Sequence, residues 1–171
     1  MTGREASAAG WLRAGLLALA AIGLAGTAAE LAFLRHWDGL VQLIPWAAVA
    51  VLGAAMACLA VRPSAARVLA ARALGAVAAA AGLYGVYEHI AENYHAGPLD
   101  AVYGPKWESL PTLSRLWAAG TGGVGPAPTL APAVLAQIAL CLFVATLAHP
   151  ALRCRPHPAL RCRPRPETRH G

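Results

Sequence analysis

The chain has 171 residues, of which 58% are hydrophobic and only 13% are charged, and its mean hydropathy is +0.52. Soluble domains carry about 25% charged residues, so this composition excludes an ordinary soluble protein and indicates an integral membrane protein. A formal net charge of +6 can indicate nucleic-acid binding, but here the arginines fall between long apolar runs, where they orient membrane spans. We therefore expect the lipid bilayer as partner, and no nucleic acid.

Four apolar stretches approach the roughly 20 residues that a helix needs to cross a hydrocarbon core. They cover residues 14–34, 40–61, 73–90 and 130–148. The second and fourth stretches carry no charge, whereas the first contains Glu30 and the third meets Glu88 and His89 near its end. Because the connections near 35–39 and 62–64 are short, consecutive spans should be antiparallel neighbours. The sequence thus predicts an all-α membrane protein, a four-transmembrane-helix up-and-down bundle.

The distribution of Lys and Arg predicts the orientation of this bundle. Eleven of them fall on one side, namely Arg4, Arg13, Arg62, Arg67, Arg72, Arg153, Arg155, Arg161, Arg163, Arg165 and Arg169. The other side has three, Arg35, Lys106 and Arg115. Since cytoplasmic loops carry the excess of basic residues, both termini are expected in the cytoplasm of a multi-pass protein of the cell inner membrane.

An alternative interpretation of the N-terminus is a cleavable signal peptide. Two arginines, an apolar stretch over 14–25 and the small residues at 26–28 fit that pattern, and cleavage would leave three spans. The apolar run continues through Leu34, however, which is long enough to cross a bilayer. We therefore favour a cytoplasmic segment over 1–13 followed by a four-helix transmembrane domain over 14–149.

Two further segments flank the predicted spans. The outer loop, about 97–128, is long enough to have structure of its own, and the spacing of Leu110, Leu113 and Trp117 around Pro111 predicts a short helix on the bilayer surface. The tail over 150–171 contains a tandem repeat, ALRCRPHP followed by ALRCRPRP. Its prolines exclude a regular helix, so we predict a disordered basic tail that contacts anionic lipid.

A polar cluster is expected at the outer ends of the helices. Its main members are Glu30, His36, Glu88, His89 and Glu92. At 1.5 Å per residue, Glu30 lies about 25 Å from Arg13 and Glu88 about 24 Å from Arg72, so both carboxylates approach the outer interface. Ionisable groups at that depth are expected to face the bundle interior and to need a partner or a proton.

Three functions remain open for this cluster. The favoured one is structural, a hydrogen-bond network in a non-enzymatic membrane or accessory protein, because no catalytic motif occurs. The alternative is a divalent-cation-binding sensor or transporter, since carboxylates and imidazoles suit such metals. The second alternative is an outer-face haem redox protein that uses two of His36, His89 and His95. A partner membrane subunit or a homo-oligomer is compatible with each.

Three runs of the sequence carry a resemblance. ELAFLRHWDGLVQLIPW at 30–46, GLYGVYEHIAEN at 82–93 and PTLAP at 128–132 resemble a group of small bacterial inner-membrane proteins of uncharacterised function. The resemblance covers the four predicted spans and excludes the repeat tail. It implies a four-helix membrane fold and adds nothing about activity.

Overall fold

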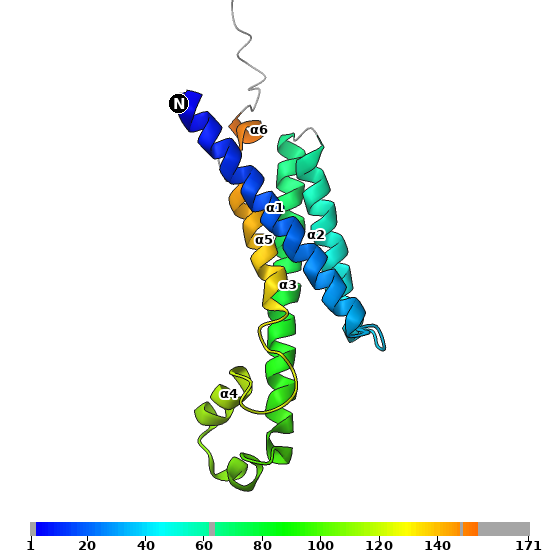
Figure 1. Cartoon of the computed structure of the whole chain (residues 1–171), viewed down its shortest axis with the longest axis vertical. Helices are drawn as coiled ribbons and strands as arrows, with labels where there is room; N and C mark the ends of the chain where they lie inside the picture. Colours follow the sequence, from blue (N-terminus) through cyan, green and yellow to red (C-terminus); the bar gives the residue numbers. More distant parts are fainter. Residues whose placement is uncertain (1–2, 62–63, 148, 154–171) are drawn as a thin grey trace, which may run out of the picture.

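The computed structural model describes residues 3–61, 64–147 and 149–153 (Figure 1). Within these ranges the chain is mostly helical and has no strand. The α-helices are α1 (Gly3–Phe33), α2 (Ile44–Ala60), α3 (Ala65–Ala96), α4 (Thr112–Gly120), α5 (Ala133–Thr146) and α6 (Pro150–Arg153). Short 3-10 helices cover Val41–Leu43, Gly97–Leu99 and Gly104–Ser109.

Three helical segments of the described chain are long and apolar enough to cross a membrane. They are Ala8–Phe33, Val41–Ala60 and Ala65–Leu99. The fourth apolar helix, α5, has 14 residues and is about 21 Å long, less than a hydrocarbon core of about 30 Å. The all-helical fold and three potential spans agree with a membrane protein. The helices also extend past the predicted spans, since α1 begins at Gly3 and α3 continues to Ala96.

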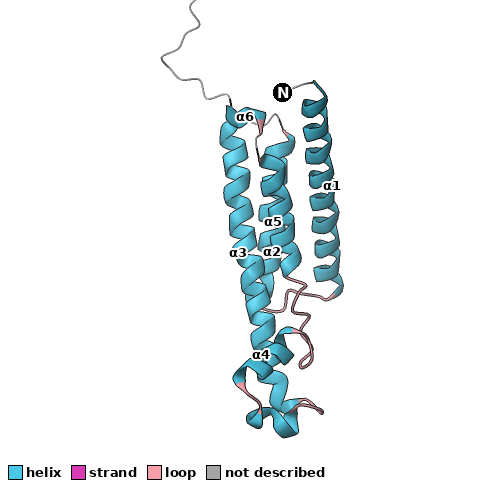
Figure 2. Ribbon diagram, turned by 90° about the vertical axis from the view of Figure 1, so that its left-hand side faces the viewer, coloured by secondary structure: helices cyan, strands magenta, loops and turns pink. Residues whose placement is uncertain are grey.

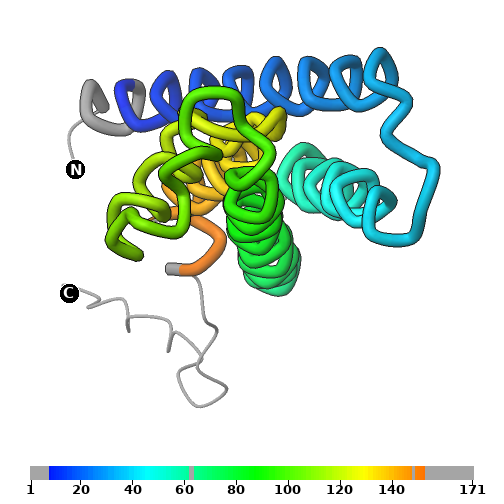
Figure 3. The backbone as a smooth tube through the Cα atoms, turned by 90° about the horizontal axis from the view of Figure 1, so that it is seen from below, coloured from blue at the N-terminus to red at the C-terminus, as the bar shows by residue number. Residues whose placement is uncertain are grey.

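Helix α3 is the central element of the bundle. It packs along α2 and along α5, while α1 crosses obliquely and makes most of its contacts with α5 (Figures 1 and 3). The short connection between α1 and α2 suggested that these two helices would be close neighbours. Helix α1 makes far fewer contacts with α2, however, than with α5. Gly23 on α1 permits the crossing, because an added Cβ there would lie 3.1 Å from Ile138 on α5.

Small residues bring α3 and α5 into backbone contact. A Cβ added at Gly82 would lie 2.9 Å from the carbonyl oxygen of Pro132, and one at Gly85 would lie 2.7 Å from the Pro132 ring. Close approach of this kind replaces the hydrophobic drive that helices lack inside lipid. The contact also fixes where α5 begins relative to α3.

The long connection after α3 folds into a compact unit over residues 97–129, here called the cap. Its small core consists of Trp107, Ala118, Ala119 and Val124, with Ile90 and Tyr94 of α3 packed against it. The predicted helix near Pro111 is confirmed as α4, which begins directly after this proline, whereas its place on the bilayer surface stays a prediction. Ile90 of α3 is therefore partly covered by the cap. Helix α3 thus carries the bundle at one end and the cap at the other (Figure 2).

The buried amide of Asn93 joins the cap to α3. Its Nδ2 donates to the carbonyl oxygens of Ala119 (3.2 Å) and Ala127 (2.9 Å), and its Oδ1 accepts from the Ala127 N–H at 2.9 Å.

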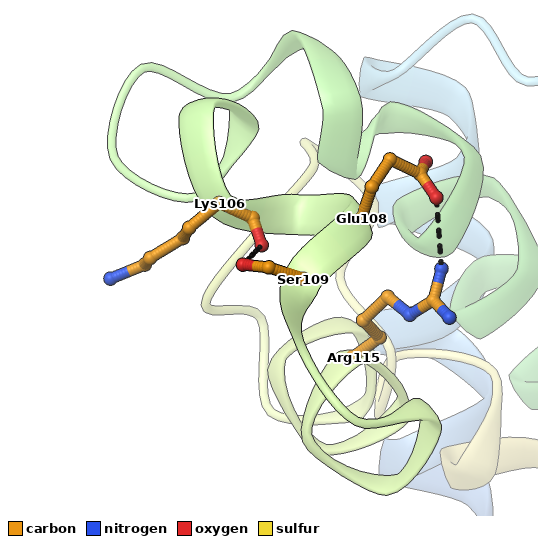
Figure 4. Close-up of polar contacts among 4 residues, drawn as sticks. All are labelled: Lys106, Glu108, Ser109 and Arg115. Atoms are coloured by element: carbon orange, nitrogen blue, oxygen red, sulfur yellow. Dashed lines mark hydrogen bonds and ion pairs between the residues drawn. The ribbon is translucent and has the colours of Figure 1, made fainter.

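Two contacts at the surface of the cap close its turns (Figure 4). Ser109 donates to the Lys106 carbonyl at 2.7 Å, and Arg115 lies 3.6 Å from Glu108.

Two arginines bind the C-terminal end of α5, which is the end farther from the cap. Arg13 of α1 donates to the carbonyl oxygen of Ala145, and Arg72 of α3 donates to both the hydroxyl and the carbonyl oxygen of Thr146, at 2.9–3.0 Å. A helix C-terminus carries unpaired carbonyls and partial negative charge. The two guanidinium groups therefore satisfy these carbonyls and offset that charge. The predicted tail starts here, and its first residues form α6; the rest lies outside the described residues.

Candidate functional site

A cavity of about 660 Å³ lies between the helices at the cap end of the bundle. Its walls come from the end of α1, the connection into α2, the C-terminal half of α3 and the segment that leads from the cap into α5. A volume of this size falls within the range of about 300–1,000 Å³ that small-molecule sites occupy. The cavity therefore unites four elements that are distant in sequence.

All five residues of the predicted polar cluster line this cavity. Glu30 and His36 come from α1 and the turn after it, and Glu88, His89 and Glu92 come from α3. Gln42 and Tyr84 also line the cavity, whereas His95 does not belong to its lining. The expectation that ionisable groups of separate spans share one region is thus met by these side chains.

The turn after α1 places His36 at the cavity. Arg35 adopts the left-handed region with φ 49°, and the His36 N–H donates to the Leu31 carbonyl at 2.9 Å. This is the geometry with which many helices end. The indole of Trp46 then donates to the His36 carbonyl at 2.8 Å, and Gln42 accepts from the Asp38 N–H at 2.9 Å.

The short length of α5 explains why a cavity exists at this position. Helix α5 begins at Ala133, level with Gly82 and Gly85, so it does not fill the space beside the last turns of α3. The irregular backbone of residues 127 and 128 and the turn that contains residues 131 and 132 take its place along the cavity wall. Inside a membrane such backbone is tolerated where it lines a cavity.

The walls are mostly apolar, and the polar groups gather toward the cap. Leu31, Ile44, Ala81 and Leu135 are among the apolar residues of the lining. Apolar walls with a few convergent polar groups are typical of ligand sites. The cavity is therefore amphipathic, with three carboxylates among its polar groups.

The polar side chains differ in how far the protein itself satisfies them. The Nδ1 atom of His89 lies 2.9 Å from the Pro128 carbonyl oxygen, which ties α3 to the segment entering α5. The Tyr84 hydroxyl lies near the Glu88 carboxylate, one helical turn away. Within the described residues, Glu30 and Glu92 form no salt bridge, because the one ion pair found there joins Arg115 to Glu108.

The described side chains do not assemble a ready metal site. No three His, Cys, Asp or Glu side chains in residues 3–61, 64–147 and 149–153 are grouped closely enough to hold a metal ion. The metal site at Glu30, His36, Glu88, His89 and Glu92 stays a prediction, as does a haem held by two of the outer histidines. The shared cavity suits a ligand larger than a metal ion.

Sequence reasoning missed several features that shape the site. The backbone of residues 127–132 forms a wall, although nothing in its composition distinguished it from an ordinary loop. The contact of Pro132 with Gly82 and Gly85 was also missed, and it depends on which face of α3 meets α5. Small residues four apart were the only signal, and such spacings are frequent in Ala-rich helices.

No known protein family, no curated protein and no solved structure matches the chain.

Proposed function

We propose that this chain is a non-enzymatic, multi-pass protein of the bacterial inner membrane that binds an amphipathic organic cation in the cavity at its outer face. In this proposal α5 forms a fourth crossing, both termini are cytoplasmic and the cap lies outside. The protein then serves as a binding, sensing or accessory subunit for a ligand that approaches from the outer leaflet.

The contacts at the arginine end support a fourth crossing. Arg13 and Arg72 precede the apolar parts of α1 and α3, and both bind the last residues of α5. Hydrogen-bonded turns extend the helical path of α5 at both ends, from the Leu130 carbonyl to the Leu147 N–H. The eleven basic residues on this side, against three on the other, favour the cytoplasm for it.

The chemistry of the cavity supports a cationic ligand with an apolar part. The lining contains three carboxylates and no Lys or Arg. The three carboxylates also outnumber the two imidazoles of the lining, which belong to His36 and His89. The first N–H groups of α5 bond to carbonyls of the preceding turns, so this helix start offers no free donors to an anion.

One observation carries the proposal: carboxylates from α1 and α3 line a single, largely apolar cavity of about 660 Å³. The structural alternative is favoured by the hydrogen bond between His89 and Pro128, which pins two elements together. That alternative does not account for Glu30 and Glu92, which line the cavity without an ion-pair partner in the described chain.

The test is binding of a fluorescent long-chain quaternary ammonium salt to the purified protein, with an uncharged amphiphile of equal chain length as a second probe. The double variant Glu30→Gln, Glu92→Gln keeps side-chain size and removes two charges. Asp38→Asn is the matched control, because Asp38 is exposed and lies outside the lining.

We expect saturable binding of the cation, at least about tenfold weaker binding to the double variant, and no change in Asp38→Asn. A tenfold change corresponds to about 1.4 kcal/mol, which two carboxylates in a partly apolar site can supply. The proposal is contradicted if the cation and the uncharged amphiphile bind equally well. It is also contradicted if the cation binds equally to the double variant and to Asp38→Asn. Unfolding of the double variant without any ligand effect supports the structural alternative instead.

A further inference from the structure

Gln137 is a polar side chain on an uncovered part of α5. Helix α5 contains no charged residue, and the Gln137 side chain is exposed rather than turned into the bundle. Its amide makes no hydrogen bond to any part of the chain that the structure describes. Figure 2 shows α5 between α3 and α1. Because Gln137 is exposed, its side chain lies on a part of α5 that the neighbouring helices leave uncovered.

The amide lies near the middle of the bilayer when α5 crosses it. Gln137 precedes Thr146 by nine residues, so it lies about 14 Å along the helix from the residue that Arg72 contacts. The hydrocarbon core is about 30 Å thick. An amide at that depth has no water to bond, and polar groups in this setting find partners on another helix.

The exposed residues around Gln137 follow a heptad pattern. They are separated alternately by three and four positions, and each is exposed or half-exposed: Leu130, Ala133, Gln137, Leu140, Val144 and Leu147. This spacing is the seam of left-handed helix pairs, in which one polar residue fixes register and partner number. Such pairs are also common between membrane helices.

We propose that this seam is the interface of a homodimer in which the Gln137 amides of two copies bond to each other across a two-fold axis. An amide both donates and accepts, so it is complementary to itself, and a two-fold axis places each residue of a central seam opposite its counterpart. A second copy therefore satisfies the amide without any other polar group, which an unrelated helix would have to supply.

The dimer leaves the proposed ligand site open. Leu135, which lines the cavity, is turned about 160° away from Gln137 around α5. The inference depends on α5 crossing the membrane and is independent of the ligand. Loss of ligand binding and loss of dimerisation are therefore separate results.

The test measures energy transfer between donor- and acceptor-labelled protein in lipid vesicles as the protein-to-lipid ratio falls. Gln137→Leu removes the amide while improving solubility in lipid, so failure to insert cannot explain a loss of dimer. Gln137→Asn retains an amide. Leu140→Ala on the seam is matched by Leu83→Ala on α3, since these leucines are 60% and 63% exposed.

We expect a wild-type dimer, roughly tenfold weaker association in Gln137→Leu and Leu140→Ala, and nearly wild-type association in Gln137→Asn and Leu83→Ala. A monomeric wild type at every protein-to-lipid ratio overturns the inference. So does a Gln137→Leu variant that associates as wild type does, or a Leu83→Ala variant as weak as Leu140→Ala.

Discussion

Individual polar side chains decide how the cap end of the molecule is built. Asn93 is fully buried and satisfies three backbone groups, two of them in the segment that returns from the cap to α5. Gly125 lies against it, because a Cβ there would meet the Asn93 side chain. Nothing in the sequence distinguishes Asn93 from nearby polar residues such as His89, and only the folded cap shows that its role is structural.

Asn93→Ala should open the cap. The substitution removes three hydrogen bonds and leaves buried backbone groups without partners, which costs about 3 kcal/mol. Hydrogen exchange of the amides in residues 97–129 should become markedly faster, while the bundle keeps its protection. Leu99→Ala is the control, since this side chain is 88% exposed. Unchanged exchange in Asn93→Ala would show that the cap does not depend on this amide.

His149 makes the stability of the arginine end depend on pH. Burial, together with the charges of Arg13 and Arg72, holds the pKa of this imidazole below its ordinary value. Its Nδ1 accepts a hydrogen bond from the Ala151 N–H, which requires the neutral ring. The unfolded chain takes up a proton near pH 6.5 and the folded chain only below that, so stability falls as pH drops below about 6.5.

The measurement is the melting temperature of purified protein at pH 7.5 and pH 5.5. On acidification, the melting temperature of wild type should fall by more than that of His149→Gln. The glutamine keeps a hydrogen-bond acceptor and does not titrate. An equal loss in both proteins would assign the effect to other groups.

At the level of elements, the contact between α3 and α5 determines the shape of the cavity. Pro132 lies against Gly82 and Gly85, and this contact sets the level at which α5 begins. The apolar runs predicted where helices occur, because hydrophobicity and length follow directly from composition. They did not predict that α1 packs mainly on α5, since loop length limits distance but does not choose the neighbour.

Gly82→Ala tests this contact. The added Cβ would lie 2.9 Å from the Pro132 carbonyl oxygen and 3.1 Å from the Ala136 nitrogen, and backbone atoms cannot turn aside. We expect a loss of about 1–3 kcal/mol in the free energy of unfolding in detergent. Gly26→Ala on α1 meets nothing within 4 Å, so it should be neutral or stabilising by up to about 1 kcal/mol. Equal effects would argue against close packing at Gly82.

For the whole molecule, the number of membrane crossings determines on which side of the bilayer the two termini lie. Charge and hydropathy predicted four spans, and the structure gives three helices long enough to cross together with the shorter α5. The five cluster residues could be predicted because rise along a helix places them at one level. The cavity between them could not, since it arises from the late start of α5 and the path of residues 127–132.

The most direct test of four crossings is whether the C-terminus lies on the same side of the membrane as the N-terminus. In a protein whose native cysteines are replaced by serine, Thr2→Cys and Gly171→Cys are treated in intact cells with a thiol reagent that cannot cross the inner membrane. Thr121→Cys, on the exposed surface of the cap, serves as the positive control. Four crossings predict labelling of Thr121→Cys alone until the membrane is permeabilised. Labelling of Gly171→Cys in intact cells while Thr2→Cys stays protected would mean that α5 does not cross, and would contradict both the four-span topology and the mid-membrane position of Gln137.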